Sequence, residues 1–343
     1  MNGVVIPMNL GADSYDIVLE RGVLRRAGEL LNLRRKVMIV TDSGVPESWV
    51  RMLADQCGEA EIFCMPAGEK NKNLDTFGEA MRRMLAFGMR REDCVAAVGG
   101  GVPGDLAGFA AACYMRGIDF YNCPTTVLSQ VDSSIGGKTA VDLDGIKNIV
   151  GAFYQPKAVL IDPDVLSTLP ERQIANGLAE AVKMALCFDE AGFSLFEKDD
   201  PVHPMDRIIG NALRIKKYVV EQDAKEHGLR RALNFGHTLG HGIESLQAEN
   251  GLYHGECVAL GMLPMCAPEV RKRLEAVLKK LGLPVRCGAE VSRVMQAVLH
   301  DKKASGNRIT AIRVEKAGSF TEQKMTPEEL AERYTDVFGG KAT

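Results

Sequence analysis

Three of the six histidines in this chain lie within one short segment, between Asn234 and Glu256, and each has glycine beside it. Two of them, His237 and His241, are four residues apart and would share one face of a helix. Neutral imidazole is the commonest side-chain ligand of metal ions, and glycine lets a ligand approach the backbone closely. The segment therefore indicates a metal or substrate site, although a helix with two hydrogen-bonded histidines of no chemical role has the same spacing.

An open, catalytic metal site takes about three protein ligands, so a further ligand should come from another element. Glu180 is the strongest candidate, because it interrupts an otherwise apolar helical segment and is followed three residues later by Lys183. Burying this carboxylate without a partner would be costly, and a metal ion would offset that cost. The alternative is a buried Glu180–Lys183 pair with a structural role, and Glu244 and Glu256 are weaker candidates that could instead support the histidines. No glutamate follows His237 directly, which disfavours a zinc peptidase.

A glycine-rich turn follows a short apolar strand and has the spacing Gly-x-Gly-x-x-Gly from Gly99 to Gly104. A helix of small residues is expected directly after it, from Leu106 to Cys113. Bare backbone N–H groups before a helix bind phosphate, so this turn could hold the pyrophosphate of a dinucleotide. The same spacing also occurs wherever a strand meets a helix tightly. Asp42, at the end of an earlier strand, could bind ribose hydroxyls or could simply cap a helix.

A second glycine-containing turn, from residue 133 to 139, resembles the end of a triphosphate-binding loop. That interpretation fails because Asp132 stands where the motif requires glycine. What remains is Lys138 in a flexible, hydroxyl-rich turn, with Lys147 and Asn148 shortly after it. These groups suit an anionic substrate, although lysines in loops are usually only solvated.

A polar stripe is predicted directly before the histidines, with Lys216 and Glu226 upstream of it. Four residues are spaced four, three and four apart and would share one face of a continuous helix: Arg230, Asn234, His237 and His241. A guanidinium, an amide and imidazoles beside a metal ion would recognise carboxylate and hydroxyl groups. Taken together, these residues predict a metal enzyme with a nicotinamide-type cofactor and a small, multiply anionic substrate.

Short β-branched segments alternate with helical patterns in the first half of the chain, which predicts a mostly parallel sheet with right-handed crossovers. The expected strands are 36–41, 61–65, 94–98, 119–122 and 158–161, with a helix at 74–87. From residue 170 to 281 nearly every segment has a helical pattern, and a late strand at 308–314 and a closing helix at 327–337 follow. We therefore expect a Rossmann-like α/β domain, 1–165, followed by a mainly α-helical domain, 166–343.

Composition excludes several classes of protein. The formal net charge of -3 argues against a nucleic-acid binder, which usually carries a positive excess. Nine cysteines, an odd number without a Cys-x-x-Cys pair, indicate reduced thiols. The N-terminal residues lack the pattern of a signal peptide, and no apolar run approaches the roughly 20 residues that cross a bilayer. The sequence therefore predicts a cytoplasmic protein that binds neither nucleic acid nor membrane.

Seven short motifs resemble 3-dehydroquinate synthases in order and spacing: Gly99-Gly-Gly-x-x-Gly-Asp105, Pro124-Thr-Thr126, Gln130-Val-Asp132-Ser-Ser-x-Gly-Gly-Lys138, Lys147-Asn148, Gly177-Leu-Ala-Glu180, Asn234-x-Gly-His237 and His254-Gly-Glu256. The resemblance covers most of the chain and is densest from about residue 94 to 261. It implies a cytosolic, usually dimeric enzyme with an N-terminal NAD domain and a C-terminal helical domain. Segment 262–282 looks shorter than the family's helical pair, but none of the matched residues lies inside it.

Carried over by position, the resemblance implies zinc, or alternatively cobalt, on Glu180, His237 and His254. His241 would then contact substrate, which replaces the ligand pair four residues apart. The implied phosphate and substrate contacts are Arg116, Lys138, Asn148, His241 and Lys303, with Lys302 as the alternative to Lys303. The implied pocket also contains Asp132, Lys183, Lys216, Arg230 and Asn234, with Glu226 nearby. The implied NAD contacts are Asp42, Glu69, Lys72, Gly100, Gly101, Asp105, Thr125, Thr126, Asp132, Lys138 and Lys147.

The implied reaction converts a seven-carbon sugar acid phosphate to 3-dehydroquinate and phosphate in the shikimate pathway. It combines transient oxidation by NAD, β-elimination of phosphate, re-reduction and an aldol closure, with a metal ion polarising the oxidised oxygen. A related cyclase that acts on a heptulose phosphate without the carboxylate is one alternative, which Lys216, Arg230 and Asn234 disfavour. The others are a metal-dependent polyol dehydrogenase, which would accumulate NADH, and a non-catalytic binding module, which would bind neither zinc nor NAD.

Overall fold

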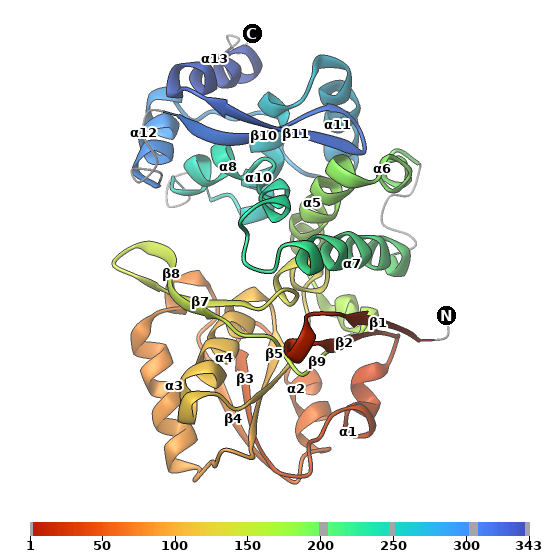
Figure 1. Ribbon diagram of the computed structural model, residues 1–343, viewed down its shortest axis with the longest axis vertical. Coiled ribbons are helices and arrows are strands. Elements are labelled where there is room, and N and C mark those ends of the chain that lie inside the picture. Colours follow the sequence, from red (N-terminus) through yellow and green to blue (C-terminus); the bar gives the residue numbers. More distant parts are fainter. Residues whose placement is uncertain (1–2, 199–204, 247–250, 302–307, 340–343) are drawn as a thin grey trace. The chain divides into compact units, whose positions relative to one another are not determined.

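The computed structural model describes residues 3–198, 205–246, 251–301 and 308–339, which form two compact units (Figure 1). The first unit runs to Pro170 and also includes Lys216–Ala224, and the second contains the other described residues. The chain therefore leaves the first unit after Pro170, returns to it at Lys216 for the last part of one helix and leaves it again after Ala224. In the described part of the chain, no helix combines the length and the apolar character that a membrane crossing requires.

A seven-stranded sheet in the order β1-β2-β9-β6-β5-β3-β4 forms the centre of the first unit. Neighbouring strands pair in parallel from β2 to β4, and β1 joins β2 antiparallel at one edge. All five expected strands are present, whereas β1 and β2 were not predicted. The strands are β1 Val4–Met8, β2 Tyr15–Leu19, β3 Lys36–Asp42, β4 Glu59–Met65, β5 Cys94–Gly99, β6 Asp119–Pro124 and β9 Ala158–Ile161.

Helices cover both faces of this sheet, which explains why its central strands are almost continuously apolar (Figure 1). Met38 and Val40 of β3 and Val95 and Ala97 of β5 belong to one core cluster with residues of α3 and α4. Because side chains alternate along a strand, the residues between them point to the other face, where α2 contacts β3 and β4. The helices are α1 Ala27–Leu30, α2 Glu47–Ala54, α3 Leu74–Ala86 and α4 Gly101–Cys113.

The order of the parallel strands identifies where a ligand should bind. Numbered along the chain from β3, the strands β3, β4, β5, β6 and β9 have the order 2-1-3-4-5, which reverses between β3 and β5. In doubly wound sheets, ligands bind beyond the carboxyl ends of the strands at such a reversal. Asp42 ends β3 and Gly99 ends β5. The fold therefore places the aspartate and the glycine-rich segment at the same position, which the sequence pattern could not show.

Two local expectations in this unit are wrong. Helix α4 begins at Gly101, five residues before the expected start at Leu106, so most of the Gly-x-Gly-x-x-Gly segment is helical. Lys138 does not lie in a flexible turn, because it is the first residue of the hairpin formed by β7 Lys138–Leu143 and β8 Ile146–Phe153. The hairpin turns at Asp144 and Gly145, whose φ angles are 51° and 79°. Consecutive positive φ angles at Asp-Gly are typical of a type I′ turn, so this hairpin had a sequence signal.

The second unit is mainly helical, as expected, with one additional antiparallel hairpin, β10·β11. Its late strand and closing helix confirm the predicted elements, whereas β11 was not predicted. The elements are α5 Glu171–Phe188, α6 Glu190–Phe196, α7 Met205–Gln222, the 3₁₀ helix Leu229–Asn234, α8 His237–Glu244, α10 His254–Met262, α11 Pro268–Lys280, α12 Val291–Asp301, β10 Ile309–Lys316, β11 Ser319–Met325 and α13 Pro327–Phe338. The last part of α7, from Lys216, belongs to the first unit.

Candidate functional site

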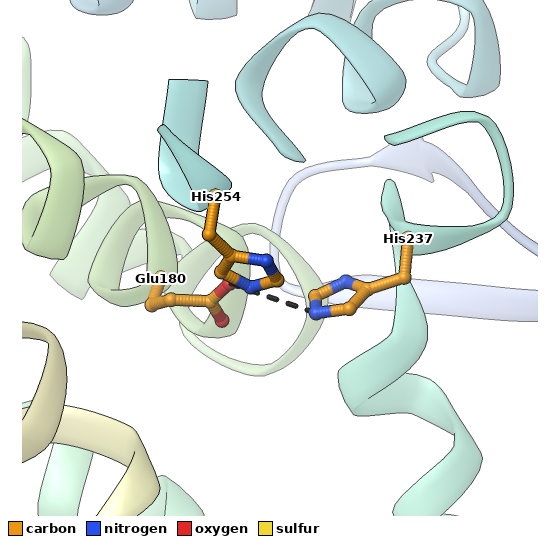
Figure 2. Close-up of side chains that lie close together, drawn as sticks. All are labelled: Glu180, His237 and His254. Atoms are coloured by element: carbon orange, nitrogen blue, oxygen red, sulfur yellow. Dashed lines mark ion pairs between the residues drawn. The ribbon is translucent and has the colours of Figure 1, made fainter. Parts of the chain in front are cut away.

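Glu180, His237 and His254 converge in the second unit (Figure 2). Glu180 projects from the middle of α5, whereas His237 and His254 are the first residues of α8 and α10. Glu180 Oε1 lies 3.6 Å from His237 Nε2 and 3.4 Å from His254 Nε2. Three segments far apart in sequence therefore bring one carboxylate oxygen and two imidazole nitrogens together.

The spacing of these atoms fits a tetrahedral metal site. With bonds of 2.0–2.2 Å from zinc to nitrogen or oxygen, two tetrahedral ligand atoms stand about 3.4 Å apart. The two separations measured from Glu180 Oε1 agree with this value and are longer than ordinary hydrogen bonds to an imidazole. Oε1 is buried and has no hydrogen-bond partner among the described residues. A divalent cation would satisfy this oxygen and leave one position open.

Burial and neighbouring charged groups set the protonation of Glu180, His237 and His254. Glu180 is 1 % exposed and forms an ion pair with Lys183, which is 2 % exposed. Burial alone would raise the pKa of Glu180, but Lys183 and the two imidazoles lower it well below its usual value, so the carboxylate is ionised. Burial and the Lys183 ammonium lower the pKa of His237. Burial would also lower the pKa of His254, but Glu180 and Glu244 raise it to about 10. A metal ion would have to displace the proton on His254 Nε2, the nitrogen that faces Glu180.

Close backbone contacts fix the helices that carry the ligands. A Cβ at Gly261 of α10 would lie 2.0 Å from the carbonyl oxygen of Gly236, the residue before His237. A Cβ at Gly255 would lie 1.9 Å from the carbonyl oxygen of Asn176, and the Gly255 N–H donates to Asn176 Oδ1 at 2.6 Å. Asn176 is one turn before Glu180 on α5. Glycine is therefore needed at both positions, because α10 touches α8 and α5 at their backbones right beside the ligands.

The two carboxylates that were weaker ligand candidates behave differently. Glu244 Oε2 lies 3.0 Å from His254 Nδ1, so this carboxylate supports a histidine. Glu256 instead accepts from the backbone N–H of Tyr253 at 2.7 Å and pairs with Arg172 at 2.7 Å. It caps the start of α10. Glu244 thus contacts a candidate metal ligand, and Glu256 holds the helix that carries it.

The predicted polar stripe on one helix face is wrong. Leu229–Asn234 is a separate 3₁₀ helix, and Gly236, at a φ of 78°, separates it from α8. Three residues per turn and a left-handed break do not keep the four, three, four spacing on one face. Arg230 is accordingly buried, at 2 % exposure, and does not line the cavity that His237 and His241 border.

That cavity, in the second unit, has a volume of about 480 Å³. Four predicted site residues line it: Glu226, Asn234, His237 and His241. Asn234 Nδ2 donates to Glu226 Oε1 at 2.7 Å, and the His237 and His241 rings are 5.2 Å apart. The other lining residues were not predicted from the sequence; they are Lys225, Arg231, Thr238, Thr310 and Ile312. Arg231 could have been found from the three-residue repeat that its 3₁₀ helix imposes, but Thr310 and Ile312 come from a distant strand.

In the first unit, Lys72 connects two other predicted NAD residues with a predicted substrate residue. Its Nζ lies 2.8 Å from Glu69 Oε1, 3.1 Å from Asp105 Oδ2 and 2.7 Å from Asn148 Oδ1. Lys72 is 3 % exposed. Burial would lower the pKa of Lys72, but the carboxylates of Asp105 and Glu69 raise it above its usual value. Burial raises the pKa of Asp105 to about 6. The cluster holds hairpin β7·β8 against the start of α4.

The remaining predicted NAD residues lie at or near the strand ends. Asp42 Oδ1 accepts from the Gly44 N–H at 2.8 Å, so it closes a turn and does not cap a helix. Burial raises its pKa. Thr125 N–H donates to the Gly99 carbonyl at 2.8 Å, which ties the ends of β5 and β6 together beside Gly100, Gly101 and Thr126. Lys138 and Lys147 are exposed on the hairpin.

Other predicted substrate residues occupy strained or paired positions. Arg116, Asn148 and Glu226 have φ angles of 69°, 54° and 62°, which are uncommon outside glycine and are often found at functional sites. Asp132 Oδ1 lies 2.6 Å from Lys216 Nζ. Lys302 and Lys303 lie outside the described residues, so their alternative assignment stays a prediction.

Solved sugar phosphate cyclases share this fold of a parallel-sheet α/β unit followed by a helical unit. A 2-deoxy-scyllo-inosose synthase, solved with carbaglucose-6-phosphate, NAD+ and Co2+, is 25 % identical with a TM-score of 0.85, covering 98 % of this chain and 100 % of that one. ValA, a 2-epi-5-epi-valiolone synthase from Streptomyces hygroscopicus solved with NAD+ and Zn2+, is 27 % identical with a TM-score of 0.85, covering 94 % and 96 %.

Sequence comparison identifies the family. The 3-dehydroquinate synthase N-terminal and C-terminal profiles match residues 62–176 and 177–304. The 3-dehydroquinate synthase of Pelobacter propionicus is 38 % identical over 349 residues, which cover 95 % of this chain and 97 % of the relative. The chain belongs to the 3-dehydroquinate synthase family, and the predicted resemblance is confirmed.

Proposed function

We propose that this protein catalyses the 3-dehydroquinate synthase reaction, which converts 3-deoxy-D-arabino-heptulosonate 7-phosphate to 3-dehydroquinate and phosphate. The observation that carries the proposal is the convergence of Glu180, His237 and His254 in a chain of this family. When bound, NAD and a divalent cation supply transient hydride exchange and polarisation of the oxidised oxygen. Zinc and cobalt both suit this donor set.

The two predicted domains would bind different parts of the reacting system. Residues 1–165 would hold NAD at the sheet reversal, with Asp42 on ribose and Gly100 and Gly101 on the pyrophosphate. Residues 166–343 would hold the metal ion and orient the substrate. Asn234 and His241 line the cavity beside the ligand His237, so an amide and an imidazole are available there for substrate oxygens.

A sugar acid phosphate is the substrate that the sequence favours over a neutral heptulose phosphate. The chain is 38–40 % identical to relatives named 3-dehydroquinate synthase but only 25–27 % identical to the two cyclases of other names. The resemblance implies carboxylate contacts from Lys216, Arg230 and Asn234, and of these Asn234 lines the cavity beside His237. We expect kcat/KM for the acid to exceed that for the neutral heptulose phosphate by about 100-fold or more, since a site that binds the carboxylate would lose that contact with the neutral sugar. Phosphate release with each substrate measures this ratio, and a preference for the neutral sugar would contradict the proposal.

Phosphate release should require both NAD and the metal ion but should consume neither. Treatment with a chelator should abolish release, and Zn2+ or Co2+ should restore it. Absorbance at the wavelength of NADH should show no accumulation during steady-state turnover, because the hydride returns to the substrate within each cycle. Stoichiometric NADH would instead indicate a polyol dehydrogenase, and activity that survives complete metal removal would contradict the role of the metal group.

The family resemblance also supports a homodimer in the cytoplasm, with a small phosphorylated substrate and neither nucleic acid nor membrane as partner. Light scattering of the purified chain would test the dimer. A monomer that retains full activity would contradict this part of the proposal without affecting the reaction.

A further inference from the structure

The imidazole of His254 is held through both of its nitrogens. Its Nε2 faces Glu180 Oε1 at 3.4 Å, and its Nδ1 lies 3.0 Å from Glu244 Oε2. Glu244 is 9 % exposed, so water competes little for this contact. An ionised carboxylate only accepts hydrogen bonds, so Nδ1 must carry the proton that it donates. The lone pair available to a metal ion is then on Nε2, the nitrogen that faces Glu180.

His237 has the same orientation but a different kind of support. Its Nδ1 lies 3.1 Å from the backbone carbonyl of Phe235, and its Nε2 faces Glu180. A backbone acceptor is insensitive to side-chain substitution, whereas the acceptor of His254 is a side chain that can be exchanged. The two histidines thus allow one supporting contact to be removed while the other stays intact.

Glu244 also connects the two helices that carry the histidine ligands. It lies on α8, the helix that begins with His237, while His254 begins α10. Glu244 on α8, the helix of His237, therefore holds the other histidine ligand, His254 on α10. His241, Glu244 and His254 additionally present ligand atoms within 4.8 Å of one another, so a second ion at this position is the competing arrangement.

We propose that Glu244 is a positioning residue of the metal centre, which fixes the ring orientation and tautomer of His254 so that Nε2 faces the ion. The proposal rests on the proposed function only in assuming that the ion binds at Glu180, His237 and His254. Carboxylates that support metal-ligating histidines typically contribute 10- to 100-fold in metal affinity.

The test compares two buried carboxylates near His254, of which Glu244 contacts its ring and Glu256 caps its helix. We expect Glu244→Gln, which keeps an acceptor but loses the charge, to weaken Zn2+ affinity about 10-fold, and Glu244→Met, which removes the acceptor, up to about 100-fold. Glu256→Gln alters the cap of α10 without touching a histidine, so it should lower the melting temperature but change affinity less than about threefold. Competition with a chromophoric chelator measures affinity in the full chain without substrate. The visible spectrum of the Co2+ form should change in the Glu244 variants and not in Glu256→Gln.

Three results would overturn the inference. Glu244 variants with wild-type affinity and an unchanged Co2+ spectrum would show that the contact does not position His254. An equal loss in Glu256→Gln would assign the effect to general disturbance of α10. Two ions per wild-type chain and one in Glu244→Met would make Glu244 a ligand of a second ion. A wild-type chain that binds neither Zn2+ nor Co2+ would instead overturn the proposed function, so the two failures are distinguishable.

Discussion

Glu180→Gln should leave the chain folded but unable to retain its metal ion. An amide lacks the negative charge that a carboxylate contributes to a divalent site, so we expect Zn2+ affinity to fall by more than the roughly 100-fold typical of a supporting residue. Metal-assisted polarisation is worth several kcal/mol, so phosphate release should fall by about 1,000-fold or more. Metal content after dialysis and initial rates of phosphate release measure the two effects.

The same substitution should expose the cost of burying Lys183. Glu180 and Lys183 are 1 % and 2 % exposed, and the variant leaves the ammonium without this carboxylate. Removing one member of a buried ion pair costs up to about 3–5 kcal/mol, whereas replacing both members by uncharged groups is often neutral or stabilising. The double variant Glu180→Gln/Lys183→Met should therefore recover the stability of the metal-free wild type but bind no metal.

Denaturant unfolding of the metal-free proteins provides the comparison. Recovery of stability without metal binding in the double variant would separate the structural and the chemical roles of Glu180. Full metal occupancy in either variant would remove Glu180 from the coordination sphere. Failure of the double variant to recover stability would show that the ion pair is not the source of the loss.

Glu180 could be predicted from the sequence because the residues next to it in the chain already show that it lies in a buried, apolar helix. A carboxylate inside an apolar helical segment must be compensated when that segment is buried, and α5 buries it. The central strands were equally visible, since strands covered on both faces are apolar throughout. Edge strand β1 and hairpin strand β8 lacked this signal because most of their residues are exposed.

The structure around His237 could not be predicted from the spacing of polar residues alone. The four, three, four pattern fitted one helix, but Gly236 adopts a left-handed conformation that ends one element and begins another. Arg230 is consequently buried, and Arg231 lines the cavity in its place. Strand β10 contributes Thr310 to the same cavity from more than 60 residues away in sequence. Such contacts between distant segments arise from tertiary packing, and the periodicity of the sequence does not predict them.

The crossing of α8 and α10 should tolerate little added volume. In Gly261→Ala the new Cβ would meet the carbonyl oxygen of Gly236 at 2.0 Å and the backbone nitrogen of Gly240 at 2.6 Å. These are backbone atoms, so no side-chain rotation relieves the clash and the helices must separate. We expect unfolding free energy to fall by about 3 kcal/mol, as in strongly overpacked cores.

Separation of these helices should also weaken the metal site, because His237 begins one of them and His254 begins the other. A displacement of about 1 Å between groups that act together can cost about 100-fold, so Zn2+ affinity should fall at least tenfold in the folded variant. The matched control is Gly288→Ala, where the new Cβ has no atom within 4 Å and φ is not positive. That variant should keep wild-type affinity and gain up to about 1 kcal/mol of stability. Denaturant unfolding and metal titration of both variants test the argument. Wild-type stability and affinity in Gly261→Ala would mean that the close helix crossing does not hold the two histidines in place.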